Sequence, residues 1–240
     1  MLSPHPDDAV LSAWSALRRR GEVVVVNVFT AVPGDGVEGR VDRLLGASDS
    51  PALMRLRLDE DRRALAQAGR DRVNLDFLDE QYRDGPTPVG RMRDAVDSTV
   101  PTAAWLCAPA GLGGHADHVL VRELALEIGR AGSVPVSLYA DLPYAVEWGW
   151  PHWVTGRPPR PFLVPEARWE RDLNAVSVPR DRLVPRVHAF GPSEAANKLR
   201  ALETYRTQFT WLNAGPLDRL RNPEVLGYEL HWDVLAPTGR

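Results

Sequence analysis

The segment from Val23 to Phe29 constrains the fold most strongly, because it reads Val-Val-Val-Val-Asn-Val-Phe. A β-branched run of this kind is typical of a strand that is buried on both faces of a parallel sheet. Shorter apolar runs predict three more strands, at Val73–Leu78, Trp105–Ala108 and Val134–Ala140. The sequence therefore predicts a mostly parallel sheet that is covered by helices on both faces.

Between these strands, apolar residues recur at three- or four-residue spacing and predict helices. They are Val10, Leu11, Trp14 and Leu17, then Leu58 and Leu65, then Leu120, Leu124 and Ile128. Gly21 and Gly129 are expected to end the first and the last of these helices. The alternation indicates an α/β fold with a Rossmann-like core. Because little chain precedes the first helix, we expect the first strand to be a stub or to begin upstream of Met1.

The bulk properties of the 240 residues favour a single domain over residues 1–240. Residues 144–165 are crowded with Trp, Pro and Gly and predict an irregular excursion or lid, whereas residues 193–208 predict a helix and residues 225–234 late strands. The net charge of −3 gives no reason to expect nucleic acid or an anionic membrane as a partner. No apolar stretch is long enough to span a membrane. We expect a cytoplasmic protein that acts on a small molecule; its oligomeric state is left open.

Two groups of His and Asp residues follow predicted strands. The first is His5-Pro6-Asp7-Asp8, where the first strand passes into the first helix. The second is Gly111-Leu112-Gly113-Gly114-His115-Ala116-Asp117-His118, after the strand around Trp105–Ala108. In open α/β sheets, ligands bind at the carboxyl ends of the strands. The two groups are therefore expected to converge on one crevice.

This combination of side chains suits a catalytic zinc ion, which usually has three protein ligands and one open position. Such a metal lowers the pKa of its water from about 15.7 to about 7 and polarises a carbonyl, so that an amide becomes hydrolysable. Asp7 and Asp8 are adjacent, so one can bind the metal while the other accepts a proton. The pattern predicts a metal-dependent amide hydrolase that uses Zn²⁺, with another divalent metal such as Fe²⁺ as the alternative.

The two motifs resemble those of the PIG-L or LmbE-like family of zinc-dependent N-acetylglucosaminyl deacetylases, and the resemblance runs through most of the chain. It implies a Rossmann-like fold and the removal of an N-acetyl or other N-acyl group from a sugar-containing small molecule, such as a secondary metabolite. At the matching positions, it implies that His5, Asp8 and His118 bind zinc and that Asp7 is the general base.

The resemblance also assigns residues around this centre. It implies that His115 stabilises the oxyanion in its protonated form or protonates the leaving amine, and that Asp117 orients and charges His115. Arg57 is a candidate for binding a substrate hydroxyl or anion, and Asp141 and Tyr144 are expected to line the substrate site. Most relatives carry Glu where this chain has Ala9.

Other functions remain open at the level of sequence. The same site suits an amidase that cleaves a larger thiol-sugar or glycopeptide conjugate. A non-catalytic Rossmann-like binding protein is a more distant alternative, because Gly111 to Gly114 lacks the Gly-x-Gly-x-x-Gly spacing of a dinucleotide site.

Several residues also have purely structural interpretations. Arg57 and Glu60 are three residues apart on a predicted helix, so a surface ion pair is as compatible with the sequence as a substrate contact. Clustered Trp residues at 148, 150 and 153 fill a core more often than they stack on a sugar. Cys107 lies in an apolar strand and is predicted to be a buried thiol.

Overall fold

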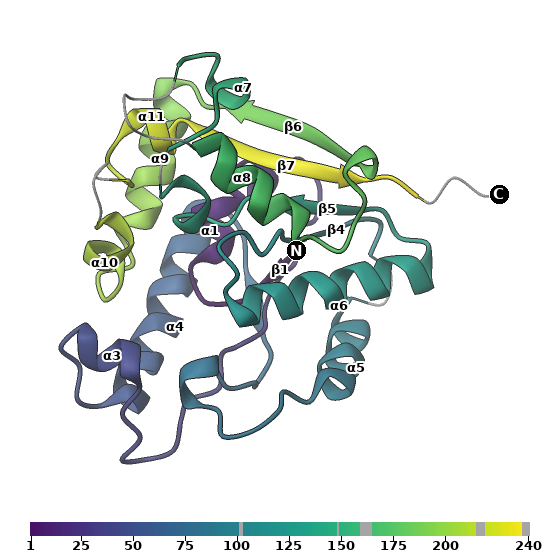
Figure 1. Ribbon diagram of the computed structural model, residues 1–240. Helices are drawn as coiled ribbons and strands as arrows, with labels where there is room; N and C mark the ends of the chain where they lie inside the picture. Colours follow the sequence, from purple (N-terminus) through teal and green to yellow (C-terminus); the bar gives the residue numbers. More distant parts are fainter. Residues whose placement is uncertain (101–102, 148, 159–164, 215–218, 237–240) are drawn as a thin grey trace.

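The computed structural model describes residues 1–100, 103–147, 149–158, 165–214 and 219–236. Its strands form two hydrogen-bonded groups (Figure 1). The first group is parallel, in the order β1 (Leu2–Ser3), β2 (Val25–Asn27) and β3 (Arg72–Asn74). The second has the order β4-β5-β7-β6 and consists of β4 (Leu106–Pro109), β5 (Val136–Tyr139), β6 (Leu183–Ala189) and β7 (Tyr228–Val234). In it, β4 and β5 are parallel, and β7 is antiparallel to both β5 and β6.

The two groups meet where β1 contacts β4. The hydroxyl of Tyr139 in β5 also donates to the carbonyl of Leu2 in β1, at 3.1 Å. β1 and β4 are neighbours, and the loops that follow them lie side by side, since the ring centroids of His5 and His115 are 5.1 Å apart. The predicted α/β fold is confirmed, including the stub-like first strand of two residues.

Helices surround these strands. They are α1 (Asp8–Ser12), α2 (Trp14–Leu17), α3 (Arg40–Leu44), α4 (Ser50–Gln67), α5 (Val89–Thr99), α6 (Ala116–Gly132), α7 (His152–Thr155), α8 (Pro165–Asn174), α9 (Pro192–Leu202), α10 (Phe209–Asn213) and α11 (Pro223–Leu226). The described residues also form three short 3₁₀ helices, η1 (Glu80–Tyr82), η2 (Tyr144–Val146) and η3 (Arg180–Arg182). In Figure 1, α6 crosses in front of the strands with α5 below it, while α4 and α9 lie to the left and pack against each other.

Some sequence predictions differ from the structure. Gly129 does not end α6, which continues to Gly132 and is followed by Ser133 in the left-handed region at φ 52°. A Cβ at position 129 would lie 2.3 Å from Cγ2 of Val136, so glycine lets the helix approach β5 closely. The predicted first helix is two helices separated at Ala13, and the predicted helix over residues 193–208 ends at Leu202.

The C-terminal part also contains elements with weak sequence signals. β6 was not predicted; it lies at the edge of its sheet, where Pro185 is tolerated because an edge N–H needs no partner. The predicted late strands at residues 225–234 are the end of α11 followed by β7.

The predicted excursion contains η2 and α7, and Trp148 and residues 159–164 lie outside the described residues. Trp150 is buried, and its ring centroid is 5.6 Å from that of Trp169, so it belongs to the core. Cys107 is buried, as predicted. Among the described residues, no helix combines the length and apolar character that crossing a membrane requires.

Candidate metal centre and cavity

The first motif occupies the tight turn between β1 and α1. Ser3 fixes this turn, because its hydroxyl donates to the His5 carbonyl at 2.8 Å and accepts from the Ala9 N–H at 3.2 Å. The His5 N–H donates to Oδ2 of Asp8 at 2.9 Å. Asp7 has φ 150° and ψ −34°, a conformation that L residues rarely adopt. The turn therefore directs three side chains from four consecutive positions into one site.

The second motif joins β4 to α6. His115 is the N-cap of α6, and His118 is buried in its first turn. The ring centroids of His5 and His118 are 5.3 Å apart, and those of His115 and His118 are 5.0 Å apart. The structure thus brings the two predicted motifs together.

His5, Asp8 and His118 have the geometry of a metal site. Oδ2 of Asp8 lies 3.4 Å from Nδ1 of His5 and 3.4 Å from Nε2 of His118. Two atoms that bind one zinc ion at about 2.0–2.1 Å with tetrahedral angles lie roughly 3.3–3.4 Å apart. The distances from Asp8 to both histidines therefore match a tetrahedral metal ion, and the ligand atoms of all three side chains lie within 4.8 Å of one another.

Both histidines are supported by carboxylates on their opposite ring nitrogens. Nδ1 of His118 lies 2.7 Å from Oδ1 of Asp141, and Nε2 of His5 lies 3.1 Å from Oδ2 of Asp117 and 3.5 Å from Asp79. A carboxylate accepts a hydrogen bond from the ring nitrogen that carries the proton. The lone pair of the other ring nitrogen is then available to the metal. The lone pairs then face Asp8, as a metal site requires.

The electrostatics of the site favour positive charge. Burial opposes protonation of His5, but the carboxylates of Asp117, Asp79 and Asp8 outweigh burial and raise the pKa of His5 well above its usual value. Burial would raise the pKa of Asp8, yet His118 and His5 hold that pKa below its usual value. The same negative potential that stabilises a proton here stabilises a divalent cation.

A second trio, His5, His115 and Asp117, also lies close enough to hold an ion. The carboxylate of Asp117 is already occupied, because Arg83 donates to it at 2.6 Å and the Glu80 N–H donates to it at 3.0 Å. Burial would raise the pKa of Asp117, but His5, Arg83 and the Glu80 N–H outweigh burial and lower this pKa to about 2. The trio with Asp8 is the better metal site, because among the described residues Oδ2 of Asp8 accepts only the His5 N–H, at 2.9 Å, and has no arginine partner.

The contacts of Asp117 differ from the sequence-based expectation that it orients His115. Its carboxylate contacts His5, and only its backbone N–H reaches His115, donating to Nδ1 at 3.3 Å. The reason is the helix start: His115 caps α6 with its ring, while the Asp117 side chain turns back toward β1. Asp117 therefore supports a candidate metal ligand.

The surroundings of His115 affect its charge. Burial, together with the neighbouring His5 and His118, lowers the pKa of His115 to about 4. Because Nδ1 accepts the Asp117 N–H, the neutral ring carries its hydrogen on Nε2. A neutral ring of this kind is a hydrogen-bond donor, whereas the charged form of His115 stays a prediction.

Asp7 lies beside the metal site without being one of its three ligands. Burial and the adjacent Asp8 carboxylate raise the pKa of Asp7 well above its usual value. Nε2 of Gln208, just before α10, donates to Oδ2 of Asp7 at 2.6 Å. This hydrogen bond connects the first motif to the C-terminal part of the chain.

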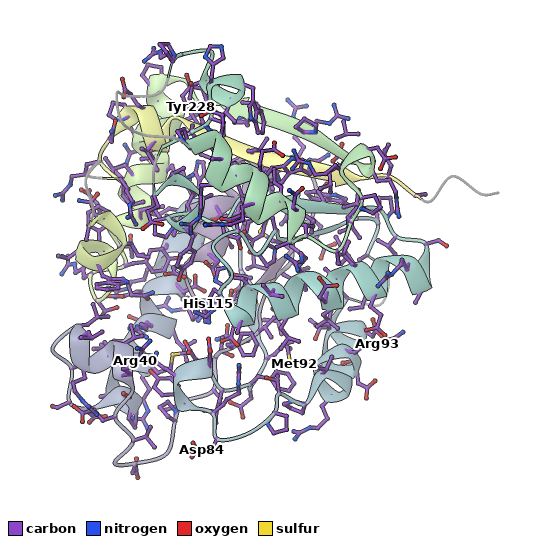
Figure 2. All side chains as sticks on the ribbon, in the orientation of Figure 1. Arg40, Asp84, Met92, Arg93, His115 and Tyr228 are labelled. Carbon is purple, nitrogen blue, oxygen red and sulfur yellow. The ribbon has the colours of Figure 1, made fainter. Side chains whose placement is uncertain are left out.

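The site opens into a cavity of about 620 Å³. Its inner wall includes His5, Asp7, Asp8, His115 and His118. Its outer wall comes mainly from α3, α4 and α10 and includes Arg40, Val41, Leu45, Met54, Arg57, Trp211 and Leu212. Figure 2 shows His115 near the middle of the molecule and Arg40 toward the lower left, so the lining extends from the core to the α3 side.

The three predicted substrate residues have different positions. Tyr144 lines the cavity, with its ring centroid 6.0 Å from that of His115. Arg57 lines it too, and the alternative of a surface pair with Glu60 is wrong, because both side chains are buried. Arg57 pairs with Asp42 at 3.1 Å. Asp141 is fully buried behind His118 and is not among the lining residues.

Several site residues were not identified from sequence. Asp79, Gln208 and Trp211 line the cavity. Beside it, Arg83 pairs with Asp117 and Asp42 pairs with Arg57. None of these unidentified residues has a motif around it, and each comes from a segment far along the chain from His5. Two sequence signals pointed to the region of Gln208: the helical composition of residues 193–208 and the resemblance of residues 198–208 to the PIG-L or LmbE-like family.

Comparisons with known proteins agree with this geometry. The sequence profile of the PIG-L family, described as GlcNAc-PI de-N-acetylase, matches residues 1–128. The 2'-N-acetylparomamine deacetylase of Streptomyces fradiae is 30% identical over 160 residues, which cover 60% of this chain and 57% of that protein. This chain therefore spans little more than half the length of that curated relative.

Two solved structures extend the likeness over the whole chain. The A40926 pseudoaglycone deacetylase Dbv21 has a TM-score of 0.74 and 25% identity, covering 100% of this chain and 97% of its own. The zinc-inhibited form of the teicoplanin deacetylase Orf2 has a TM-score of 0.74 and 26% identity, covering 99% of this chain and 98% of its own. With the profile matching more than half of its residues, this chain belongs to the PIG-L family of deacetylases.

Proposed function

We propose that this protein is a zinc-dependent N-deacetylase that acts on an acetylated amino sugar within a larger conjugate. The observation that carries the proposal is the pair of 3.4 Å distances from Asp8 to the two histidines, with each histidine held by a carboxylate behind it. Asp141 and Asp117 are positioning residues in this scheme, because they act through His118 and His5.

Zinc in this position would supply a Lewis acid for the acetamide carbonyl and lower the pKa of a water molecule. Asp7 accepts a proton from the water that attacks the carbonyl carbon, since its carboxylate lines the cavity beside the ligands. The C–N bond then breaks, the proton passes from Asp7 to the nitrogen, and acetate and a free amine are released.

His115 stabilises the negative charge that develops on the carbonyl oxygen. Its Nε2–H is free to donate because Nδ1 is occupied by the Asp117 N–H. A preorganised donor contributes strongly to catalysis at such an oxygen. The neutral state that follows from the lowered pKa is sufficient for this role.

The outer wall of the cavity favours a substrate with an apolar part next to the sugar. Val41, Leu45, Met54 and Leu212 contribute aliphatic surface, and Trp211 is 53% exposed. An exposed indole can stack on a sugar or an aromatic ring. This wall suits a glycopeptide-like conjugate, as in the names of two structural relatives, better than a polycationic aminoglycoside.

Metal content and amine release measured on the same samples test the proposal. We expect about one zinc per chain in the wild-type protein and its loss in His118→Ala. Acetyl release is expected from an N-acetylglucosamine glycoside with an apolar aglycone. Since one relative was solved in a zinc-inhibited form, zinc should be titrated from below one equivalent, with Fe²⁺ in parallel. A protein that takes up no metal would refute the proposed hydrolase and favour a non-catalytic Rossmann-like binding protein. Activity only on larger acyl groups would favour the alternative of an amidase that cleaves a larger thiol-sugar or glycopeptide conjugate.

A further inference from the structure

The backbone of Arg40 is fixed at the outer wall of the cavity. Arg40 is the first residue of α3, and it lines the cavity. The Gly39 N–H donates to the hydroxyl of Ser50 in α4 at 2.8 Å. The Val41 N–H donates to Oε1 of Gln81 in η1 at 3.2 Å. Because both neighbours of Arg40 are held by other elements, α3 presents this side chain from a defined position.

The guanidinium of Arg40 is exposed to solvent and has no counterion. In the part of the chain that the structure describes, the Arg40 side chain makes no ion pair and no hydrogen bond. The other arginine on the cavity wall, Arg57, pairs with Asp42 at 3.1 Å. Arg43, further along α3, pairs with Glu38 at 3.0 Å. Arg40 therefore carries a positive charge that a molecule in the cavity can reach.

The charges of the cavity are separated along its length. The inner wall contributes the carboxylates of Asp7, Asp8 and Asp79, at the candidate metal centre. In Figure 2, His115 marks this inner region near the middle of the molecule, and Arg40 lies toward the lower left, on the α3 side. A negatively charged group on a ligand is therefore favoured at the α3 end of the cavity, away from the carboxylates.

The wall next to Arg40 is aliphatic. Val41 and Leu45 of the same segment line the cavity, and so does Met54 of α4. These side chains suit an apolar part of a ligand but offer no partner to a charged group. A ligand that matches the whole cavity therefore has an acetamide at the metal centre, an apolar linker, and a negative charge at its far end.

We propose that Arg40 binds an anionic group, for which a carboxylate is the probe, on the aglycone of the conjugate that this protein deacetylates. The inference rests on the proposed function. A guanidinium is planar and forms two parallel hydrogen bonds with a carboxylate, so it recognises the shape as well as the charge of this group. The same positive charge repels a polycationic aglycone. Arg40 is thus a specificity residue that acts at a distance from the acetamide.

The test compares two glycosides that differ in charge alone. They are 8-carboxyoctyl N-acetylglucosaminide and its primary amide, whose flexible chain lets the end group reach the outer wall. With zinc-loaded wild-type protein, we expect the KM of the acid to be about fivefold below that of the amide. The kcat values should be similar, because the end group is bound alike before and during the reaction. In Arg40→Gln, the two KM values should become equal.

Two results of this comparison would overturn the proposal. One is a wild-type protein that has the same KM for the acid and the amide. The other is an Arg40→Gln variant that keeps the wild-type preference. Charge reversal sharpens the test, since Arg40→Glu should prefer the amide, and a preference for the acid in this variant also contradicts the proposal.

Arg43→Gln is the matched control. Arg43 lies on the same helix, its side chain is 64% exposed, and it does not line the cavity. Its replacement changes the net charge by the same amount as Arg40→Gln, so it should keep the fivefold preference of the wild-type protein. An equal loss of preference in both variants would indicate a general attraction to the basic surface and would overturn the role of Arg40.

The wild-type protein distinguishes failure of this inference from failure of the proposed function. If zinc-loaded wild-type protein hydrolyses neither glycoside, the deacetylase proposal fails and the role of Arg40 fails with it. If the wild-type protein hydrolyses both glycosides with the same KM, only the role of Arg40 is refuted. Melting temperatures of the variants establish that each is folded when assayed.

Discussion

Asp7 combines a buried carboxylate with a φ of 150°, so the choice of its replacement decides what a mutation measures. Alanine would add backbone strain, whereas asparagine tolerates positive φ more readily and keeps the shape. We expect Asp7→Asn to lower kcat by about 10²–10⁴ because the general base is lost. Zinc content should stay unchanged, since His5, Asp8 and His118 remain. Elemental analysis and steady-state kinetics check both points, and a fully active variant would show that Asp7 is not the base.

Asp141 acts on the metal through His118. Its Oδ1 lies 2.7 Å from Nδ1 of His118, and its Oδ2 accepts from the Leu112 N–H at 2.9 Å. An asparagine has one acceptor oxygen and cannot accept from both the His118 ring and the Leu112 N–H. His118 would then be held less firmly, so Asp141→Asn should weaken zinc binding about 10–100-fold. Competition with a chromogenic chelator measures the affinity. Unchanged affinity with reduced activity would instead place Asp141 in substrate binding.

At the residue scale, the sequence predicted side chains that belong to compact motifs. His5, Asp8, His115 and His118 could be predicted to converge because both motifs follow predicted strands, and ligands in open α/β sheets bind at the carboxyl ends of the strands. Their supporting partners could not, because Asp117 contacts His5 across 112 positions and Gln208 contacts Asp7 across 201. Such pairings depend on the packing of whole elements, which local patterns do not encode.

At the element scale, Lys198 in α9 joins β7 to the first helices. Nζ of Lys198 donates to Oε1 of Glu229 at 2.7 Å, and both side chains are fully buried. Glu229 also accepts from the N–H groups of Trp14 and Ser15, at 2.7 and 2.9 Å, so it caps α2. Burial alone would raise the pKa of Glu229, but the Lys198 ammonium holds it well below its usual range.

Removing the ammonium should therefore leave a buried charge without its counterion. We expect Lys198→Met to lower the free energy of unfolding by about 3–5 kcal/mol. Arg43→Met is the matched control, because Arg43 pairs with Glu38 at 3.0 Å while 64% of its side chain is exposed. Its effect should be below about 0.5 kcal/mol. Urea denaturation of both variants measures the difference; equal effects would contradict a structural role for the buried pair.

Elements were predictable where burial made their sequence distinctive. β2, β4 and β5 are buried; β2 and β5 lie within predicted apolar runs, and β4 extends one residue beyond its run, to Pro109. β6 alternates between buried and exposed positions only weakly and contains Pro185, so neither strand pattern applied to it. The break at Ala13 between α1 and α2 has no proline or glycine to mark it. It is stabilised by Glu229 from the other end of the chain, which a local window does not contain.

At the scale of the whole molecule, Asp61 connects three distant parts of the chain. Its carboxylate accepts from Nδ2 of Asn27 in β2 at 2.7 Å and from the hydroxyl of Tyr205 at 2.8 Å. Asp61 itself lies on α4, so this one buried group fixes α4 between the parallel sheet and the segment that carries Gln208. Its ionisation is therefore linked to the stability of the entire fold.

Burial raises the pKa of Asp61 from 3.8 to about 6, although Tyr205, Asn27 and Arg72 oppose the shift. Between these two values the native state binds more protons than the unfolded chain, so stability falls as the pH rises through this window. The difference amounts to roughly 3 kcal/mol at 1.36 kcal/mol per pKa unit. We expect Asp61→Asn to lose this slope, because asparagine does not titrate. Urea denaturation of both proteins from pH 4 to pH 7, with a chelator present so that metal release does not contribute, measures it. Parallel curves for the two proteins would show that Asp61 titrates alike in the folded and unfolded states.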